Sequence, residues 1–488
     1  MDCLLQIVFF KLIFFFVFVY SDNLFKKPLF NTKTPYFWVR NISDVIQENE
    51  FSTTILNGQN CQLEGLNILL RHGSRFPTLK WIKRITALHA RLTANTAILS
   101  NYPFMNKWTN TFLESQEGLL SSLGVDEMKR LGKRYGTRFK VLLDGKLKQV
   151  KFATSYRDRT KSSFKYFYEG LNETSPSSGH TPEAKVDNTK TRFYERCSKY
   201  IKEVDDNDEI LKEANSFEAD SKISNIVQKI QTKLGTSNIS IDFDDVFVIH
   251  QICAFELGLN GQSDWCQFFD IDDLRVISYW DDLEGKNIKD KGNYKQKKLS
   301  TKIDLQRSIK PKWNTIKQDM AIQSIGNRLA LIRLIFLNDS KKLSRTLENQ
   351  TGNIQPVDIF FGHQDTILPI FTAFGLFKDT EPFTAANYDA NINRKFSTSE
   401  ITPFSANVAF SLYKCGANGK HAFKIFVNEE PVNIPACGGM VCSYSDVKVY
   451  YKELAQCDFG KICDTSSAVR FRGYTILSIV LVLITVMI

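Results

Sequence analysis

The chain has no internal repeat and no low-complexity tract, which excludes solenoid architectures and repetitive disordered chains. Nothing in it resembles a nucleic-acid-binding module. Its 488 residues are 43% hydrophobic and 12% aromatic, a composition typical of a folded globular protein. This length exceeds what one compact core usually needs, so we expect one large domain with a substantial insertion, or two domains.

Apolar runs mark both ends of the chain. At the amino end, Leu12–Tyr20 precedes Ser21, a pattern that predicts a secretory signal over residues 1–21. Asp2 and the late Lys11 depart from the usual charge pattern of such signals, which leaves an uncleaved anchor as the alternative.

At the carboxyl end, Tyr474–Ile488 is uncharged and follows the small residues of Asp464–Ala468, so it resembles a lipid-anchor attachment signal. A spanning helix needs about 20 apolar residues. We therefore predict a glycolipid-anchor signal over residues 465–488, with a short tail helix as the alternative. Both ends predict the secretory pathway, with the protein at the cell surface, outside the cell or in the endoplasmic reticulum lumen.

Cysteines and glycosylation motifs agree with that compartment. Of the ten cysteines, Cys3 lies in the predicted signal, and the remaining nine are an odd number for an oxidising compartment. We expect most to be paired and one to be free. Candidate glycosylation sites are the sequons at Asn41, Asn172, Asn238, Asn338 and Asn349.

The formal charge of +10 predicts an anionic partner, and Lys286–Lys312 is a basic run with few acids. A solvated lysine-rich loop would have the same composition. Because a secretory signal argues against a nucleic-acid partner, a small polyanion or an acidic surface remains.

The decapeptide LLRHGSRFPT at residues 69–78 places two arginines and a histidine directly after an apolar run. Leu66–Leu70 predicts a buried parallel strand, so Arg71, His72 and Arg75 would follow its carboxyl end. The pattern R-H-G-x-R-x-P fixes five positions and is rare by chance.

A second strand is predicted at Val150–Ser155, followed by a helix that begins at Arg159. Phe164, Phe167 and Tyr168 would lie on one side of that helix.

A third strand is predicted at Val357–Phe361. It precedes His363, Asp365 and a helix from near Thr366, with Pro369 in the first helical turn. Because ligand crevices of open α/β sheets lie outside the carboxyl ends of strands, the residues after these strands should share one site: Arg71, His72, Arg75, Arg159, His363 and Asp365.

These residue types fit the hydrolysis of a phosphate ester. Guanidinium groups bind a phosphate dianion through paired, charge-assisted hydrogen bonds. His72 could attack phosphorus, while Asp365 protonates the leaving alcohol and then deprotonates water. Because arginines neutralise the phosphoryl charge, this chemistry needs no metal or other cofactor. Structural roles suit the other histidines, which are His89, His180, His250 and His421.

Blocks across most of the chain resemble the histidine acid phosphatases, and within them the multiple inositol polyphosphate phosphatases. They are NTKTPY (31–36), CQLEGLNILLRHGSRFPTLKWIK (61–83), TSYRDRTKSSFKYFYEGL (154–171), TRFYERCSKY (191–200), DWCQFFDIDD (264–273), FFGHQDTILPIFTAFGLFKDTEPFTAANY (360–388) and RKFSTSEITPFSANVAFSLYKC (394–415). The resemblance implies a phosphoglycerate-mutase-like α/β sheet flanked by helices. Residues 22–160 and 350–464 would form this core, and residues 161–349 a mostly helical inserted domain.

By that resemblance His72 is the phosphohistidine nucleophile and His363 the second active-site histidine. It also assigns Arg71, Arg75 and Arg159 to a phosphate clamp, and Thr78 and Lys80 to the substrate side.

The proton donor departs from the resembled branch, which has His-Ala-Glu where this chain has His363-Gln364-Asp365. The aspartate reaches about one methylene less far, and general acids are sensitive to misplacement of about 1 Å. In an empty site we expect the surrounding arginines to lower the pKa of Asp365.

The resemblance suggests the disulfides Cys61–Cys415 and Cys253–Cys266, and short spacing suggests Cys437–Cys442. Cys197 would then pair with Cys457 or Cys463, which leaves the other unpaired.

Together these features predict a secreted or surface-anchored phosphomonoesterase that acts on inositol polyphosphates, with 2,3-bisphosphoglycerate as a further candidate substrate. Lysines such as those in Lys286–Lys298 would attract a polyanion. A broad-specificity acid phosphatase is one alternative. A non-catalytic surface protein that binds phosphorylated ligands is another, because Asp365 departs from the family pattern and an anchor is predicted.

Overall fold

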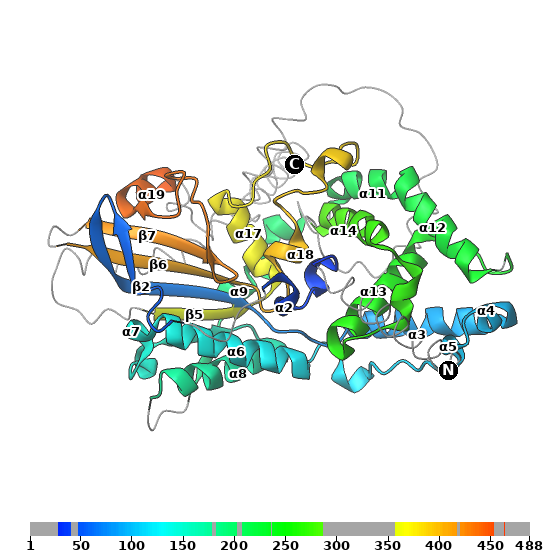
Figure 1. The fold of residues 1–488 in the computed structure, drawn as a ribbon, viewed down its shortest axis with the longest axis horizontal. Helices are drawn as coiled ribbons and strands as arrows, with labels where there is room; N and C mark the ends of the chain where they lie inside the picture. Colours follow the sequence, from blue (N-terminus) through cyan, green and yellow to red (C-terminus); the bar gives the residue numbers. More distant parts are fainter. Residues whose placement is uncertain are drawn as a thin grey trace, which may run out of the picture.

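The computed structural model describes residues 28–40, 47–177, 182–202, 207–235, 237–285, 357–416, 420–452 and 463. These residues form two regions that lie side by side, a β-sheet with helices on both faces and a region of helices alone (Figure 1). The α/β sheet flanked by helices that the sequence predicts is therefore confirmed.

Within the described residues, nine strands form one mixed sheet in the order β4-β3-β5-β2-β6-β7-β8, with β1 paired to β2 and β9 to β7. The neighbours from β4 to β2 are parallel, and the pairs from β2 to β8 are antiparallel. The strands are β1 (Thr53–Leu56), β2 (Gln59–Arg71), β3 (Lys151–Thr154), β4 (Ala184–Val186), β5 (Val357–Gly362), β6 (Asn407–Cys415), β7 (Lys420–Val427), β8 (Glu430–Pro431) and β9 (Cys442–Ser443).

Helices cover both faces of the sheet and build the second region. Those on the sheet are α6 (Ser122–Arg138), α8 (Asp158–Thr174), α17 (Gln364–Phe374) and α19 (Tyr444–Tyr450). Those of the helical region are α3 (Leu79–Thr93), α11 (Lys212–Glu218), α12 (Ser221–Leu234), α13 (Phe243–Asn260) and α14 (Ile271–Gly285). Shorter helices are α2 (Tyr36–Val39), α4 (Thr96–Asn101), α5 (Phe104–Lys107), α7 (Lys140–Leu143), α9 (Asn188–Thr191), α10 (Ser198–Tyr200) and α18 (Thr398–Ile401).

Side chains of β2 alternate between the two faces of the sheet, as the period of a strand requires. Leu66, Ile68 and Leu70 join the core under α6 and α8, whereas Leu69 joins the core under α17. Because β2 and β5 are central and covered on both sides, their sequences read as continuous apolar runs. The predicted strands at β2, β3 and β5 are confirmed, as is the buried face of α8.

The position of Pro369 differs from the sequence prediction. Helix α17 begins at Gln364, so Pro369 lies inside the helix rather than in its first turn. A proline has no N–H, and the carbonyl of Asp365 therefore lacks its usual intrahelical donor. Burial of Ile367, Ile370 and Phe371 against the sheet stabilises the helix despite this loss.

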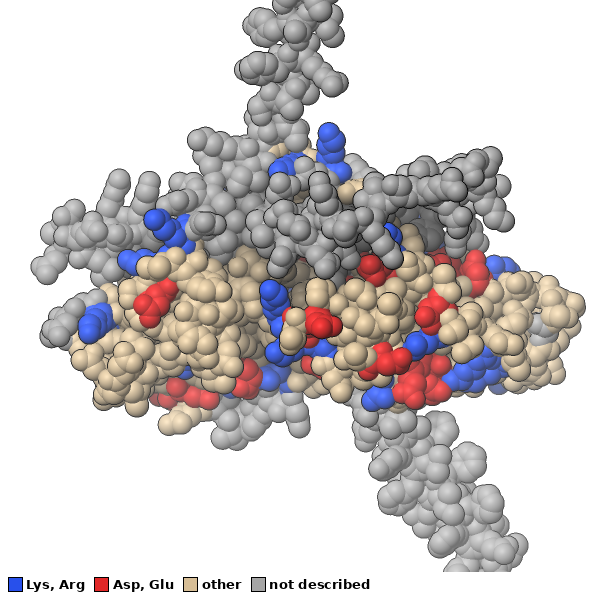
Figure 2. All heavy atoms as spheres, turned by 90° about the horizontal axis from the view of Figure 1, so that it is seen from above, with Lys and Arg blue, Asp and Glu red and all other residues tan. Residues whose placement is uncertain are grey.

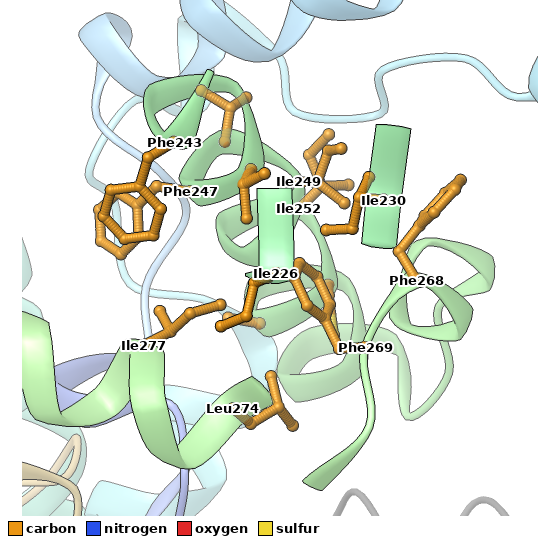
Figure 3. Close-up of a cluster of buried hydrophobic side chains, with 14 of the residues drawn as sticks. Ile226, Ile230, Phe243, Phe247, Ile249, Ile252, Phe268, Phe269, Leu274 and Ile277 are labelled. Atoms are coloured by element: carbon orange, nitrogen blue, oxygen red, sulfur yellow. The ribbon is translucent and has the colours of Figure 1, made fainter. Parts of the chain in front are cut away.

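The helical region has its own hydrophobic core (Figure 3), which packs α12 and α14 against α13. Helix α13 is buried on nearly all sides, which explains why its sequence lacks a polar stripe. Figure 3 labels ten of the core residues: Ile226, Ile230, Phe243, Phe247, Ile249, Ile252, Phe268, Phe269, Leu274 and Ile277.

Two elements bear on the predicted domain boundaries. Helix α3, within residues 22–160, contributes to the core of the helical region, and β4, within residues 161–349, extends the sheet. The division of the chain into a discontinuous core and an inserted domain stays a prediction.

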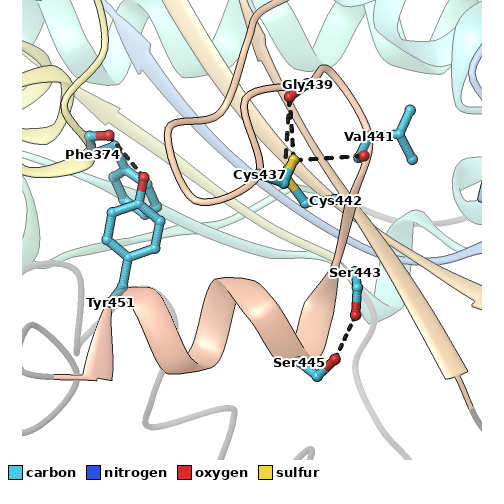
Figure 4. Close-up of a disulfide and its surroundings, with 8 residues drawn as sticks. All are labelled: Phe374, Cys437, Gly439, Val441, Cys442, Ser443, Ser445 and Tyr451. Atoms are coloured by element: carbon cyan, nitrogen blue, oxygen red, sulfur yellow. Dashed lines mark hydrogen bonds between the residues drawn. A yellow bond between two sulfur atoms is a disulfide. The ribbon is translucent and has the colours of Figure 1, made fainter.

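Disulfides link elements in both regions. Cys61–Cys415 joins the neighbouring strands β2 and β6, and Cys253–Cys266 holds α13 to the turn that follows it. Cys437–Cys442 closes a turn that leads into β9 (Figure 4). The structure contains these three predicted pairs and joins Cys197 to Cys463. The odd cysteine, Cys457, lies outside the described residues.

Several predicted features also fall outside the described residues, namely residues 1–21 and 465–488, Lys286–Lys312, His180, Asn41, Asn338 and Asn349. Asn172, at the end of α8, and Asn238, before α13, are both exposed. In the described part of the chain, no helix is long and apolar enough to cross a membrane.

A buried ion pair beneath the sheet should be important for stability. Glu429 accepts two hydrogen bonds of 2.8 Å from Arg134, and both side chains are nearly fully buried. Glu429→Ala leaves the buried Arg134 guanidinium without its counter-charge and should lower the free energy of unfolding by about 3–5 kcal/mol. Denaturant unfolding measures this change. The control is Glu430→Ala, since the Glu430 side chain is 60% exposed and pairs with Arg40, and it should cost at most about 1 kcal/mol. Equal losses of stability in the two variants would contradict the importance of the ion pair between Glu429 and Arg134.

Candidate active site

Parallel pairing of β2 and β5 brings two histidines together. The register sets Arg71 opposite Gly362, and the backbone N–H of His72 donates to the Gly362 carbonyl at 3.2 Å. His72 and His363 therefore leave neighbouring strands at the same edge of the sheet. Their ring centroids lie 5.3 Å apart, with the rings nearly edge to face.

The His72 ring has a defined tautomer. Its Nδ1 lies 2.9 Å from the carbonyl oxygen of Gly73, and a carbonyl oxygen can only accept. Nδ1 therefore carries the proton, and Nε2 has the lone pair. Burial, followed by the charges of Arg159 and Arg71, holds the pKa of His72 well below its ordinary value. A neutral ring with a free lone pair on Nε2 can act as a nucleophile.

Arg71 and Arg159 flank this histidine as buried or partly buried cations. Arg71 Nη1 donates to the Thr402 carbonyl at 2.6 Å, and the guanidinium stacks on the Phe404 ring at 4.5 Å. Burial and then the charge of Arg75 lower the pKa of Arg71 to about 9, and the same two causes lower that of Arg159 to about 9. Cations that destabilise one another favour an anion between them.

The remaining hydrogen-bond donors near His72 also suit the binding of an anion. Arg75, after the strand, donates from Nη1 to the Phe76 carbonyl at 2.8 Å. The Nε atoms of Arg71 and Arg159 are buried without a hydrogen-bond partner among the described residues, and so is the hydroxyl of Thr78. Thr78 is the N-cap residue of α3 and Lys80 lies in that helix's first turn. Buried donors without partners are costly, and a bound oxyanion would satisfy them.

His363 has two partners on its Nε2 atom, the Ser155 hydroxyl at 2.9 Å and Arg192 Nη1 at 2.9 Å. Glu195 holds the Arg192 guanidinium with two hydrogen bonds. Sequence reasoning missed Arg192 as a site residue. The sequence clue to Arg192 was its place in the TRFYERCSKY block, which resembles the family. This block precedes no predicted strand or helix, so its position relative to the site could not be inferred.

Asp365 lies in the first turn of α17, two residues after His363. Burial raises its pKa, against the opposing charges of Arg192 and Arg71. The prediction of a lowered pKa is therefore wrong, because the loss of hydration outweighs the nearby cations. A carboxyl group that keeps its proton suits a general acid.

The structure thus brings His72, His363, Asp365 and the three predicted arginines to one edge of the sheet, linked by the contacts and mutual charge effects above. Figure 2 shows Lys and Arg side chains near the middle of one face, where the two regions of the molecule meet. Among the described residues, no group of three or more His, Cys, Asp or Glu side chains could hold a metal ion.

Comparison with known proteins gives the family. The sequence profile of the histidine phosphatase superfamily (branch 2) matches residues 62–428, three quarters of the chain. The chain belongs to this superfamily. This histidine phosphatase is 27% identical to multiple inositol polyphosphate phosphatase 1 of Homo sapiens over 468 residues, which cover 90% of each chain. It is also 27% identical to the Gallus gallus protein of that name, over 82% of this chain and 84% of the relative.

The fold agrees with the family. The crystal structure of the phytase from D. castellii superposes with a TM-score of 0.61 at 18% identity, covering 89% of this chain and 87% of the phytase. The histidine phosphatase described here is therefore a phosphatase enzyme with the expected fold. This outcome favours catalysis over the alternative of a non-catalytic binder.

Two neighbouring arginines allow a matched test of the anion site. Arg159→Gln removes a partly buried donor and should weaken binding of inorganic phosphate about tenfold or more. Arg157 is exposed and stacks on Tyr156 at 4.7 Å, so Arg157→Gln should change the affinity by less than about threefold. The phosphate-dependent rise in melting temperature reports both affinities. Equal losses in the two variants would argue that general charge, not this site, binds the anion.

Proposed function

We propose that this histidine phosphatase is a phosphomonoesterase that removes phosphates from inositol polyphosphates through a phosphohistidine at His72. The observation that carries the proposal is a neutral histidine, oriented by the Gly73 carbonyl, beside guanidinium groups that have unsatisfied buried donors. Arginines alone would suit a binding site. The oriented lone pair on Nε2 is what favours group transfer.

In the first step, His72 Nε2 attacks phosphorus and the bond from phosphorus to the ester oxygen breaks. The ring becomes a phosphorylated imidazolium. Nδ1 keeps its proton and continues to donate it to the Gly73 carbonyl. Asp365 gives its proton to the leaving alcohol and becomes a carboxylate. Arg71, Arg75 and Arg159 stabilise the charge on the three non-bridging oxygens.

In the second step, water attacks the phosphohistidine from the side vacated by the alcohol. The Asp365 carboxylate takes a proton from this water, and the bond between phosphorus and nitrogen breaks. Inorganic phosphate leaves, and both side chains return to their initial protonation states. His363, held through Nε2 by Ser155 and Arg192, would keep its ring against the phosphoryl group.

The substrate class rests on the relatives and on charge. Both relatives compared above are named multiple inositol polyphosphate phosphatase. Thr78 and Lys80 would contact phosphates that are not being cleaved, and the lysines of Lys286–Lys298 would attract a polyanion. By the same chemistry, 2,3-bisphosphoglycerate remains a candidate substrate.

A broad-specificity acid phosphatase is the second candidate, since the clamp and nucleophile would act on any accessible monoester. Comparing kcat/KM for phytate and for nitrophenyl phosphate separates the two. A preference for phytate supports the narrower assignment, and the reverse supports the broader one.

We propose that the protein enters the secretory pathway through a signal at residues 1–21 and is held at the cell surface by a lipid anchor or tail helix at residues 465–488. The four disulfides support an oxidising compartment. Glycans on Asn172 and Asn238 would be accessible. Release from cells by a phospholipase that cleaves glycolipid anchors tests the anchor.

Purified protein should release phosphate from phytate without added metal, and His72→Ala should abolish this release because no other group would replace the nucleophile. Acid-labile phosphorylation of the protein during turnover should disappear in the same variant. Phosphate binding should persist, since the arginines remain. Full activity of His72→Ala would refute the phosphohistidine mechanism.

Asp365→Asn should slow hydrolysis of alkyl phosphates far more than that of nitrophenyl phosphate, whose phenolate leaves without a proton. A raised pKa keeps Asp365 protonated to a higher pH than an ordinary aspartic acid. Wild-type hydrolysis of alkyl phosphates should therefore fall as pH rises through that pKa. This fall should be weaker for nitrophenyl phosphate.

The matched control is Asp365→Glu, which restores the residue of the resembled branch and should retain activity. If Asp365→Asn slowed both substrates equally, the proton donor would be a different group.

A further inference from the structure

One buried carboxylate lies directly behind the proposed nucleophile and takes no part in the mechanism above. Glu127, on α6, is completely buried and accepts four hydrogen bonds. Its Oε1 accepts from the Tyr36 N–H at 3.0 Å and the Ser74 hydroxyl at 2.9 Å. Its Oε2 accepts from the Ser74 N–H at 2.8 Å and the Ser405 hydroxyl at 2.9 Å. Each oxygen therefore faces one backbone N–H, which can only donate.

The loop after β2 packs tightly on the start of α6. The Ser74 carbonyl accepts from the backbone N–H and the hydroxyl of Ser121, at 2.9 and 2.8 Å. A Cβ atom at Gly124 would lie 2.1 Å from the Ser74 carbonyl oxygen, and one at Gly73 would lie 2.6 Å from that of Gly124. Glycine at both positions lets the helix approach the loop closely enough for Glu127 to reach it.

The Ser74 N–H belongs to the same peptide group as the Gly73 carbonyl. This planar unit therefore makes two hydrogen bonds in opposite directions, one from its N–H to Glu127 Oε2 and one to its carbonyl from His72 Nδ1. Any rotation of the peptide plane would weaken both bonds together.

We propose that Glu127 is a positioning residue that acts on the nucleophile through this peptide group. The carboxylate fixes the peptide plane, and the Gly73 carbonyl then fixes the His72 ring with Nε2 toward the phosphate. The negative charge also polarises the peptide, which strengthens the carbonyl as an acceptor, because hydrogen bonds in a chain reinforce one another. In catalytic triads a carboxylate orients the catalytic histidine by a direct hydrogen bond. Here a peptide group lies between the carboxylate and the histidine.

A second contact holds the backbone of the same histidine. Ser405, whose hydroxyl donates to Glu127, also donates its N–H to the His72 carbonyl at 3.1 Å. Ser405 is fully buried and adopts φ 58°, which is uncommon for a residue other than glycine. Burial raises the pKa of Glu127, while the hydrogen bonds from Tyr36, Ser74 and Ser405 oppose that rise. The net effect is a raised pKa, so the charged carboxylate that the proposal requires is present above that pKa, and its geometric support is the one backbone N–H that donates to each oxygen.

The test compares two substitutions at the same carboxylate. Glu127→Gln keeps the shape but removes the charge and turns an NH2 group toward one of the two backbone N–H donors. Ser74→Ala removes one hydrogen bond to Glu127 but leaves the Ser74 N–H and the peptide route intact. With phytate, kcat should fall about 10- to 100-fold in Glu127→Gln, with KM within about threefold, and less than about fivefold in Ser74→Ala.

A direct readout comes from nuclear magnetic resonance of protein labelled with 15N-histidine, in which His72→Ala identifies the His72 signals. Wild-type His72 should carry its proton on Nδ1, with the proton resonance shifted downfield by the bond to Gly73. Glu127→Gln should move that resonance upfield, and Ser74→Ala should leave it near its wild-type position. A role of Glu127 in folding alone would change the melting temperature but not this resonance in the folded variant.

Three outcomes overturn the proposal: wild-type His72 protonated on Nε2, an unchanged resonance and kcat in Glu127→Gln, or equal damage by Ser74→Ala. If Glu127→Gln does not fold, Glu127→Asp replaces it, since it keeps the charge but withdraws the carboxylate by one methylene. Full kcat and an unshifted resonance in Glu127→Asp would likewise overturn the proposal.

The inference about Glu127 rests on the proposed function, but different experiments refute the function and the role of Glu127. An inactive wild-type enzyme would refute the function, whereas the His72 resonance tests the role of Glu127 without any turnover.

Discussion

Parallel hydrogen bonding between β2 and β5 sets Arg71 opposite Gly362, and every other part of the site is arranged around that register. His72 and His363 meet because each is the first residue beyond its strand. A slip of one residue would turn Arg71 and the apolar side chains of β2 to the opposite faces of the sheet. The alternation of Leu66, Ile68 and Leu70 with Leu69, which fills two separate cores, prevents such a slip. Packing of the apolar residues of β2 thus determines how far apart His72 and His363 lie.

Burial has the same electrostatic effect on three groups at this edge. It lowers the pKa of His72 and His363 and raises that of Asp365. All three shifts favour the neutral form, so the arginines supply most of the positive charge that a phosphate dianion meets. Protonation of the histidines would remove the lone pair that the nucleophile needs. Ionisation of Asp365 would remove the proton that the leaving alcohol needs. The loss of hydration at this edge therefore favours the protonation states that the proposed phosphoryl transfer requires.

The sequence was most informative where chemistry and local structure coincide. The three strands, the residues after them and the fold class could be predicted, because apolar runs, a rare motif and strand ends point to the same edge of the sheet. Arg192 and Glu127 could not, because Arg192 lies at the bend between α9 and a short 3-10 helix and Glu127 lies within α6, and only the folded chain brings them to the site. The pKa of Asp365 was predicted in the wrong direction, since nearby charges can be counted in a sequence but loss of hydration cannot.

The disulfide Cys61–Cys415 spans 354 positions of sequence, and both histidines lie between its ends. Backbone and disulfide together form a closed covalent ring around the catalytic centre. One proteolytic cut within that ring opens it without separating the pieces, so His72 and His363 stay on a single covalent molecule. Only reduction together with cleavage would leave the two halves of the site held by non-covalent contacts alone, among them the pairing of β2 with β5 and with β6. A nicked form of this enzyme would therefore migrate as intact protein until a reductant is added.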